Sequence, residues 1–167
     1  MTRRALFLDR DGVINIDKGY VHKIDDFDFV PGIFEFCRQA VEQGYQLIVV
    51  TNQSGIGRGY YTEQDFRTLT QWMLDAFADK GAPIQKVFYC PHHPTAGRGN
   101  YLQDCECRKP KPGMLNQAIG EFGLTAEQCL MLGDNQSDIA AAQAAGVRGV
   151  KVKSGGADYQ ALAALLL

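Results

Sequence analysis

The sequence lacks any apolar run of about 18 or more residues, the length that a transmembrane helix needs. It also lacks an excess of charge of either sign, since 17 lysines and arginines stand against 19 acidic residues, a formal net charge of -2. A chain with this balance has no general attraction to nucleic acid or to an anionic membrane. We therefore expect neither as a partner, and any binding of phosphate must come from a local group of basic residues.

A secretion signal is not expected either. Arg3 and Arg4 precede an apolar run, but the run stops after four residues at Asp9, short of the roughly 7 to 15 residues of a signal peptide. We expect a cytoplasmic protein. Internal repeats, linkers and low-complexity segments are also missing, and 167 residues with 46% hydrophobic content suit a single domain over residues 1–167. No long apolar seam remains once a core is assigned, which favours a monomer.

Short apolar runs recur along the chain and end abruptly in polar residues, a pattern typical of strands buried on both faces. They cover residues 5–8, 47–50, 87–89, 130–132 and, more weakly, 149–152. Helical patterns lie between them, at 31–43, from Thr62 to near Gly81, at 112–122 and at 137–145. Strands that alternate with helices predict an α/β fold with a doubly wound, mostly parallel sheet and right-handed crossovers.

Polar groups follow three of the expected strands at their carboxyl ends. They are Asp9 and Asp11 after the first, Thr51, Asn52, Gln53 and Ser54 after the second, and Asp134 and Asp138 after the fourth. Ligands of open parallel sheets bind beyond the carboxyl ends of the strands. A solvated loop would explain any one of these groups, but the three together favour one functional site.

Three of these carboxylates, Asp9, Asp11 and Asp134, would repel one another in a crevice unless a cation lay between them. Oxygen ligands select a hard ion, and Mg²⁺ suits a site that also binds a phosphate group. Asp138 comes four residues after Asp134, so one helical turn is expected to bring it back to steady that carboxylate.

Two basic residues are candidates to bind a phosphate group beside these carboxylates. Arg108 and Lys109 precede a Pro-Lys-Pro turn at 110–112, and this rigid turn suits the binding of an anion in a fixed position. Thr51 and Asn52 add neutral donors. A nucleophilic aspartate, a second aspartate as acid and base, a divalent cation and a phosphate clamp together indicate phosphoryl transfer through an aspartyl phosphate.

Five cysteines, an odd number, argue against a disulfide framework in a reducing compartment. Cys37 and Cys129 stand alone in apolar surroundings and are interpreted as small buried hydrophobes. The other three lie in one loop with two histidines: Cys90, His92, His93, Cys105 and Cys107. Three thiols and one imidazole make a closed structural zinc site, with free buried thiols as the alternative. The spacing does not decide between His92 and His93.

Binding of zinc would order this loop, which the burial of its few apolar side chains would not. Residues 90–107 are rich in glycine, proline and asparagine and have few apolar groups to bury. A zinc ion would fix the loop so that Arg108 and Lys109 project into the site. A zinc module for binding nucleic acid or protein, without catalysis, would instead need clustered basic and aromatic residues. The loop offers Arg98 and Tyr101 against Asp104 and Glu106, which disfavours this alternative.

Four ordered segments resemble the motifs of the haloacid dehalogenase superfamily of phosphatases. They are LDRDGV at 8–13, VTN at 50–52, Lys109 and GDNQSD at 133–138. The resemblance implies that Asp9 attacks phosphorus, and that Asp11 protonates the leaving oxygen and then activates water. It further implies that Thr51 and Lys109 stabilise the phosphoryl group, with Mg²⁺ held by Asp9, Asp134 and the backbone carbonyl of Asp11. The strand before Asp9 would lie at the centre of the sheet, between the second and fourth strands.

The spacing leaves no room for a cap domain, either between Asp11 and Leu47 or between the third strand and Lys109. An open site is therefore expected, with specificity drawn from loops at 15–30, 52–61 and 90–108.

Further segments resemble a capless, zinc-containing subgroup, the bacterial heptose bisphosphate phosphatases and the related histidinol-phosphate phosphatases. They are GYVH at 19–22, TNQSGIGRG at 51–59, CPHHP at 90–94 and CRKP at 107–110. The resemblance favours His92 as the zinc ligand. It implies removal of the 7-phosphate of a heptose 1,7-bisphosphate on the route to the ADP-heptose precursor of lipopolysaccharide, with histidinol phosphate as the alternative substrate.

The same resemblance gives a set of candidate substrate-binding residues. They are Asp17, Lys18, Gly19, Tyr20, Asn52, Gln53, Ser54, Arg58, Arg108 and Asn135. Arg108 would recognise the sugar phosphate that stays in place, and Arg58, between two glycines, is a candidate for a second phosphate. Asn135 has an equal alternative as a polar residue at a helix N-terminus.

Overall fold

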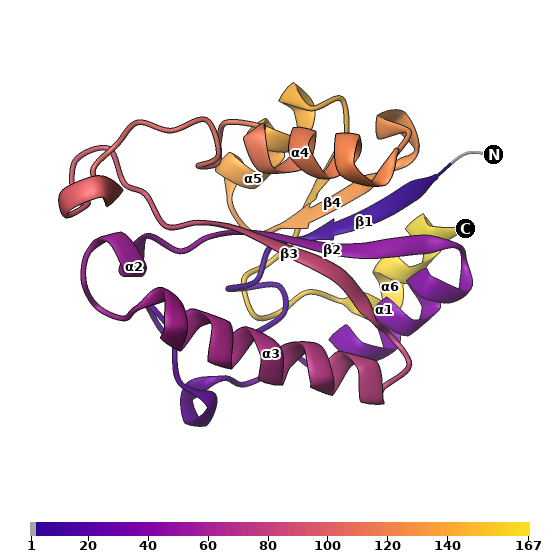
Figure 1. The fold of residues 1–167 in the computed structure, drawn as a ribbon. Coiled ribbons are helices and arrows are strands. Elements are labelled where there is room, and N and C mark those ends of the chain that lie inside the picture. Colours follow the sequence, from indigo (N-terminus) through magenta and orange to yellow (C-terminus); the bar gives the residue numbers. More distant parts are fainter. Residues whose placement is uncertain (1–2) are drawn as a thin grey trace.

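The computed structural model describes residues 3–167, so the first two residues of the expected domain lie outside it. Five strands form one sheet in the order β3-β2-β1-β4-β5, and every pair is parallel (Figure 1). Their bounds are β1 Arg4–Leu8, β2 Tyr45–Asn52, β3 Ile84–Cys90, β4 Leu130–Gly133 and β5 Arg148–Lys151. All five expected strands are confirmed, and β1 lies between β2 and β4 as the resemblance implied.

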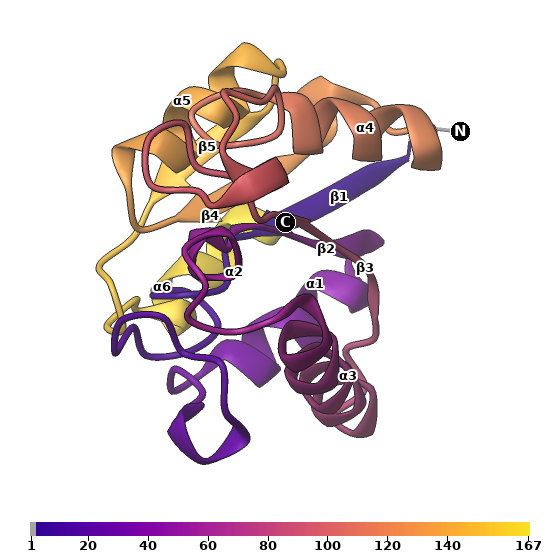
Figure 2. The same cartoon turned by 60° about the vertical axis from the view of Figure 1, so that its left-hand side comes forward.

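Helices cover both faces of this sheet. On one face lie α4 Gly113–Phe122 and α5 Gln136–Ala144, and on the other lie α1 Ile33–Glu42, α3 Glu63–Asp79 and α6 Tyr159–Leu162 (Figures 1 and 2). The short helix α2, Ser54–Gly57, follows β2 at the end where the strands finish. Short 3-10 turns lie at Ile24–Asp26, Gly99–Tyr101, Ala126–Gln128 and Ala163–Leu166. The doubly wound α/β fold is thereby confirmed.

The apolar run of β1 is continuous because each face of the strand meets its own core. Ala5 and Phe7 pack into the cluster under α4 and α5, while Leu6 and Leu8 pack into the cluster over α1 and α3. Neighbouring side chains of a strand point to opposite faces, so a strand covered on both sides needs no polar alternation. Cys37 and Cys129 lie in these two clusters, which confirms them as small buried hydrophobes.

The helix boundaries follow from local signals in the chain. Thr62 accepts a hydrogen bond from the backbone N–H of Asp65, whose carboxylate accepts one from the backbone N–H of Thr62, a capping box that starts α3. Gly123 ends α4 with φ of 61°, a left-handed conformation that favours glycine. Pro112 lies just before α4, at the N-cap, rather than in its first turn.

Two long connections replace a cap domain. The segment between β1 and α1 runs as a loop with one 3-10 turn, and the segment between β3 and α4 runs as the cysteine-containing loop. Both rise beyond the same end of the sheet (Figure 2). In the part of the chain that the structure describes, no helix has the length and hydrophobicity that crossing a membrane requires.

Candidate active site

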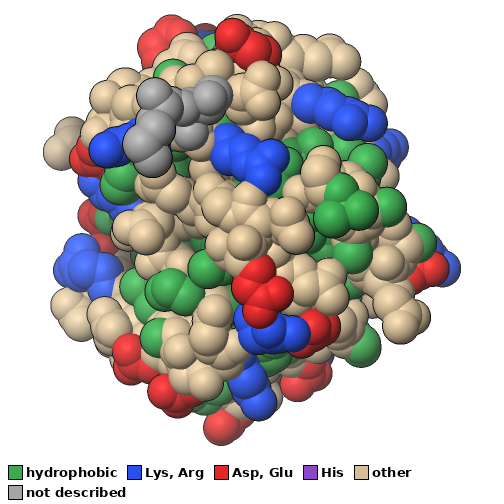
Figure 3. Space-filling model, turned by 90° about the vertical axis from the view of Figure 1, so that its right-hand side faces the viewer, with side chains coloured by type: hydrophobic (Ala, Val, Ile, Leu, Met, Phe, Trp, Pro, Cys, Tyr) green, Lys and Arg blue, Asp and Glu red, His purple; other side chains and the backbone are tan. Residues whose placement is uncertain are grey.

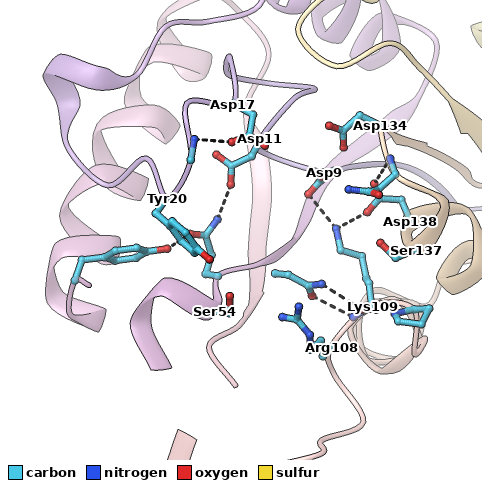
Figure 4. A pocket seen from close by; sticks show the side chains of 16 residues that line it. Asp9, Asp11, Asp17, Tyr20, Ser54, Arg108, Lys109, Asp134, Ser137 and Asp138 are labelled. Atoms are coloured by element: carbon cyan, nitrogen blue, oxygen red, sulfur yellow. Dashed lines mark hydrogen bonds and ion pairs between the residues drawn. The ribbon is translucent and has the colours of Figure 1, made fainter. Parts of the chain in front are cut away.

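The three polar groups expected at the strand ends do meet in space. They surround an open cavity of about 600 Å³ beyond β1, β2 and β4 (Figure 4). Of the candidate residues, those that line it are Asp9, Asp11, Asp17, Gly19, Tyr20, Asn52, Gln53, Ser54, Arg108, Lys109, Asp134 and Asn135. Tyr61, Pro110, Ser137 and Asp138 line it as well.

Lys109 is the centre of the buried ion pairs in this cavity. Its Nζ lies 2.9 Å from Asp9 Oδ1 and 2.7 Å from Asp138 Oδ1, and it donates a third hydrogen bond to the carbonyl of Val50. All three protons of the ammonium group therefore have acceptors, which a buried cation needs. The loop after β3 thus places its lysine between the ends of β1 and α5 (Figure 4).

The charges of this cluster leave an excess of negative charge. Carboxylate oxygens of Asp9, Asp134 and Asp138 lie within 4.8 Å of one another. Three carboxylates with one lysine amount to a net charge of -2 among these four groups. Burial raises the pKa of Asp9 to about 8, the positive charge of Lys109 opposes this rise, and the charge of Asp138 adds to it. A divalent cation would balance the charge and keep Asp9 ionised, so the donor set fits a hard metal ion.

Gly12 makes room for this acidic group. Its φ is +91°, and a Cβ atom there would lie 2.1 Å from Asp134 Oδ2 and 2.8 Å from Ser154 Oγ. Any side chain would displace the Asp134 carboxylate, so only glycine allows β1 and β4 to bring their acids together.

The position of Asp138 differs from the expectation. Its carboxylate pairs with Lys109 and accepts a 3.1 Å hydrogen bond from the backbone N–H of Asn135, instead of steadying Asp134. An acid in the first turn of α5 meets unpaired backbone N–H groups there, and these donors are better partners for its carboxylate than the carboxylate of Asp134. Asp138 therefore fixes Lys109 and the start of α5 together.

Asp11 points away from Lys109, into a group of donors that the sequence did not reveal. Its Oδ1 accepts hydrogen bonds from Arg10 Nη2 at 2.9 Å and from Asn15 Nδ2 at 3.0 Å, and its Oδ2 accepts one from Gln53 Nε2 at 3.2 Å. Tyr61 donates to the carbonyl oxygen of the Gln53 amide. Burial raises the pKa of Tyr61 to about 12, so this hydroxyl keeps its proton at neutral pH.

Thr51 and Asn52 lie at the end of β2, where Asn52 lines the cavity and the buried Thr51 does not. The buried hydroxyl of Thr51 accepts a hydrogen bond of 2.9 Å from Gln53 Nε2. The Asn52 side chain accepts from the backbone N–H of Lys109 at 3.1 Å and donates to its carbonyl at 3.2 Å. These two bonds join β2 to the loop that carries Lys109.

Two of the candidate substrate-binding residues do not line the cavity. Lys18 forms an exposed ion pair of 2.6 Å with Asp28. Arg58 donates to Ser54 Oγ at 3.3 Å and lies over the ring of Tyr20. Tyr20 itself lines the cavity with φ of +53°, unusual for a residue other than glycine.

Arg108 differs from these two because it faces the cavity. Its Nη1 is buried and has no hydrogen-bond partner among residues 3–167. A guanidinium group presents five donors in a fixed plane, so this nitrogen is suited to an incoming anion.

A second cluster gathers in the loop after β3. The ligand atoms of Cys90, His92, Cys105 and Cys107 all lie within 4.8 Å of one another. The three sulfurs are 2.9 to 3.4 Å apart, and His92 Nδ1 lies 3.5 Å from Cys107 Sγ. These separations are slightly shorter than the ~3.8 Å edge of a tetrahedron with zinc–sulfur bonds of about 2.3 Å. The cluster can close around one metal ion.

The structure separates the two histidines of this loop. His93 Nδ1 accepts hydrogen bonds from the backbone N–H groups of Thr95, at 3.2 Å, and Ala96, at 2.9 Å. Its ring therefore stabilises a turn, while the ring of His92 faces the thiols. The spacing left the choice of metal-ligating histidine open. Because the ring of His93 is used in the turn at 93–96, His92 is the histidine that joins the cluster.

Comparisons with known proteins agree with this geometry. A family model described as HAD-hydrolase-like matches residues 106–165. The crystal structure of D,D-heptose 1,7-bisphosphate phosphatase from B. bronchiseptica, complexed with magnesium and phosphate, matches this fold with a TM-score of 0.81 and 29% identity. The match covers 92% of this chain and 82% of that chain.

Two curated relatives resemble the chain over most of their length. D-glycero-beta-D-manno-heptose-1,7-bisphosphate 7-phosphatase of Pasteurella multocida is 51% identical, over 92% of this chain and 83% of the relative. D-glycero-alpha-D-manno-heptose-1,7-bisphosphate 7-phosphatase of Burkholderia mallei is 54% identical, over 88% and 78%. With the site geometry and the order of its motifs, the chain therefore belongs to the haloacid dehalogenase-like phosphatases, in the family of the heptose-1,7-bisphosphate 7-phosphatases.

Proposed function

We propose that the protein is a Mg²⁺-dependent phosphatase that removes the 7-phosphate of D-glycero-D-manno-heptose 1,7-bisphosphate through a phosphorylated Asp9. The observation that carries this proposal is the buried Lys109, which links the carboxylates of Asp9 and Asp138 at the floor of an open cavity. The names of the 51% and 54% identical relatives support the substrate.

In the first step, a carboxylate oxygen of Asp9 attacks phosphorus. The bond from phosphorus to the sugar oxygen breaks, and Asp11 gives its proton to that oxygen. In this proposal Lys109 and Thr51 would donate to the phosphoryl oxygens as charge develops on them, and Lys109 would exchange one of its present acceptors for a phosphoryl oxygen. Arg108, with its unpaired Nη1, would bind the phosphate that stays on the sugar.

In the second step, Asp11 takes a proton from water, and the water oxygen attacks phosphorus. The bond between phosphorus and Asp9 breaks, which releases inorganic phosphate and restores the Asp9 carboxylate, while Asp11 regains the proton that it gave to the leaving oxygen. One aspartate therefore acts as acid and then as base, so its carboxyl group must lie in a fixed position in both steps.

Asp9, Asp134 and the backbone carbonyl of Asp11 would hold Mg²⁺. When bound, the ion would offset the negative charge that the phosphate brings to a site already rich in carboxylates. With all three carboxylates ionised, Asp9, Asp134, Asp138 and Lys109 carry a net charge of -2, which a divalent ion would balance.

We further propose that Cys90, His92, Cys105 and Cys107 hold a structural zinc ion. Four ligand atoms within 4.8 Å support a closed site with no position left for a substrate or water. The ion would fix the loop before Arg108 and Lys109. An enzyme with this substrate would work in the cytoplasm, in the synthesis of the heptose precursor of lipopolysaccharide.

Release of phosphate from a panel of substrates tests the proposal. The panel holds both anomers of heptose 1,7-bisphosphate and histidinol phosphate, because relatives named for either anomer are similarly identical to this chain. We expect heptose bisphosphate to react fastest and ³¹P NMR to identify heptose 1-phosphate as the product. Faster hydrolysis of histidinol phosphate, or loss of the 1-phosphate, would overturn the proposed substrate.

A further inference from the structure

The arginine that separates the two aspartates of the site in the sequence is fully buried. Arg10 is 1% exposed and packs with its guanidinium carbon 5.7 Å from the ring centre of Phe27. Its Nη2 donates to Asp11 Oδ1 at 2.9 Å and to the carbonyl of Val21 at 2.7 Å. Neither Nε nor Nη1 has a hydrogen-bond partner in residues 3–167.

Stability alone gives little reason for an arginine in this position. Burying a guanidinium group costs desolvation, and two donors without partners add to the cost. A buried ion pair is often no more stabilising than apolar side chains of the same volume. An apolar side chain would fill the space beside Phe27 without these costs, so the charge and the donors of Arg10 are what needs an explanation.

The contacts of Arg10 give one. A single nitrogen, Nη2, joins the Asp11 carboxylate to the backbone of the loop at Val21. Asn15 and Gln53 supply the other donors to Asp11, so the carboxylate is held by three side chains from two segments, the loop after β1 and the residue that follows β2. Of the three donors only Arg10 is charged, and hydrogen bonds to charged partners are about twice as strong as neutral ones.

The orientation of the Gln53 amide supports the same arrangement. Its Nε2 faces two acceptors, Asp11 Oδ2 and Thr51 Oγ1, while its Oε1 accepts from Tyr61. A flipped amide would place its oxygen against a carboxylate oxygen, so the amide donates to Asp11. The site therefore presents donors to Asp11 throughout.

We propose that Arg10 is a positioning residue for proton transfer by Asp11. This inference rests on the proposed role of Asp11 as acid and base. Arg10 holds the carboxyl group in one orientation and ties it to the backbone at Val21, next to Tyr20 at the cavity wall. Without Arg10, the nucleophile Asp9 keeps its own partner, Lys109, and only the steps that need Asp11 slow down.

Leaving groups of different basicity separate this role from a merely structural one. A sugar alkoxide needs the proton from Asp11, whereas nitrophenolate leaves p-nitrophenyl phosphate without one. We expect Arg10→Met to lower kcat/KM for the sugar bisphosphate by about 10-fold to 100-fold, the effect of losing a hydrogen bond to a charged group. For the aryl phosphate we expect a loss of less than about threefold, since its first step needs no acid.

A second readout follows from the hydrolysis of the phosphorylated enzyme, which needs Asp11 as a base with either substrate. With p-nitrophenyl phosphate, Arg10→Met should release a burst of nitrophenolate equal to the enzyme concentration, followed by slow turnover. Arg10→Lys keeps the charge and should recover part of both effects. Phe27→Leu removes the ring beneath Arg10 but no donor to Asp11, so it should lower the melting temperature without changing the substrate ratio or giving a burst.

Asp11→Asn distinguishes failure of this inference from failure of the proposed function. Suppose that Asp11→Asn shows the leaving-group effect, but that Arg10→Met and Arg10→Lys each lower kcat/KM by the same factor for both substrates and give no burst. The positioning role is then wrong. If Asp11→Asn itself shows no leaving-group effect, the role of Asp11 is wrong, and the inference fails with it. If Arg10→Met does not fold, Arg10→Lys is compared with Phe27→Leu. The ratio of kcat/KM between the two substrates and the presence of a burst then decide whether Arg10 has the positioning role.

Discussion

At the scale of single residues, the site depends on how a few buried charges are partnered. Lys109 satisfies two carboxylates at once, and Arg10 and Asn15 hold the carboxylate that is proposed to move protons. Removing one member of a buried ion pair lowers the stability of the fold, because the charge left behind is neither paired nor solvated.

Replacing Lys109 should therefore destabilise the whole domain. Lys109→Met would leave Asp9 and Asp138 buried without a cation, and we expect the free energy of unfolding to fall by about 3 to 5 kcal/mol. Urea unfolding measures this change. Lys111→Met is the matched control, since that lysine is only two residues away but forms partly exposed ion pairs and should cost less than about 1 kcal/mol. Equal effects of the two variants would contradict the central role of Lys109.

Asp9→Asn should abolish turnover, and its effect on the stability of the metal-free protein should depend on pH. Folding raises the pKa of Asp9 from 3.8 to about 8, so the folded state holds this proton more tightly than the unfolded state. The stability that this proton contributes is complete below pH ~4 and is lost as the pH rises to about 8. An amide does not titrate. In chelator, the stability of the variant relative to the natural protein should therefore increase from pH 4 to pH 8 in thermal unfolding, and a decrease would contradict this.

The sequence allowed the main candidates to be named but not their partners. Asp9, Asp11, Thr51, Lys109 and Asp134 stand at strand ends or in ordered motifs, so pattern alone could find them. The sequence did not assign a role to Arg10, although it lies inside the motif at 8–13, and Asn15 and Tyr61 lie outside the motif that contains Asp11, where a polar residue is usually solvated. Their roles depend on contacts between segments that only the fold brings together.

At the scale of elements, the loop after β3 and helix α2 support each other. A Cβ atom on Gly57 would lie 2.4 Å from the carbonyl oxygen of Pro91, and the backbone N–H of Arg98 donates to the carbonyl of Gly57 at 2.8 Å. Tyr101 donates to Glu63 at 2.7 Å, which joins the loop to the start of α3. A metal in this loop would therefore also stabilise the α2 segment beside the cavity.

Removal of the proposed zinc ion should loosen a defined part of the molecule. With a strong chelator, we expect faster amide hydrogen exchange at residues 90–107 and 54–58 and a lower melting temperature, because the loop has little apolar surface to order it. Residues 33–42 of α1, on the far side of the sheet, serve as the internal control and should exchange as before. An unchanged melting curve together with unchanged exchange would count against a structural metal.

The capping box of α3 gives a prediction of ordinary size. Thr62→Ala removes the side-chain acceptor for the N–H of Asp65 and should lower the free energy of unfolding by about 1 kcal/mol. Thr62→Ser keeps the hydroxyl and should recover most of the loss, as measured by urea unfolding. A serine variant as unstable as the alanine variant would show that the cap is not responsible.

The strands and the long helices were predictable from their patterns, and the shortest helices were not. The strands appeared as apolar runs, and α1 and α3 as amphipathic stretches between a start signal and a glycine. Helices α2 and α6 have four residues each, too few for a 3.6-residue period to appear. Their positions come from tertiary contacts such as that of Gly57 with Pro91.

At the scale of the whole molecule, the sheet places all the chemistry at one end. The carboxyl ends of β1, β2 and β4 and the loop after β3 meet there, while the start of β1 and the C-terminus lie at the other end (Figure 1). On the end of the molecule away from the site, positive and negative side chains are interspersed (Figure 3). This mixed surface and the net charge of -2 suit a protein whose partner is a small molecule.

We expect a monomer in solution. Light scattering coupled to size-exclusion chromatography should give a mass near 18.4 kDa that does not change with protein concentration. A stable mass of twice this value would contradict the expectation and would call for a search for an apolar interface.

Trapping the covalent intermediate tests the central claim most directly. Enzyme quenched during turnover and treated with borohydride, which reduces an acyl phosphate to an alcohol, is digested and sequenced by mass spectrometry. We predict reduction at residue 9 alone, lost in Asp9→Asn and increased in Asp11→Asn, where hydrolysis of the intermediate is slow. Reduction at another residue, or none in an enzyme that accumulates product in a burst, would contradict the claim that Asp9 is the nucleophile.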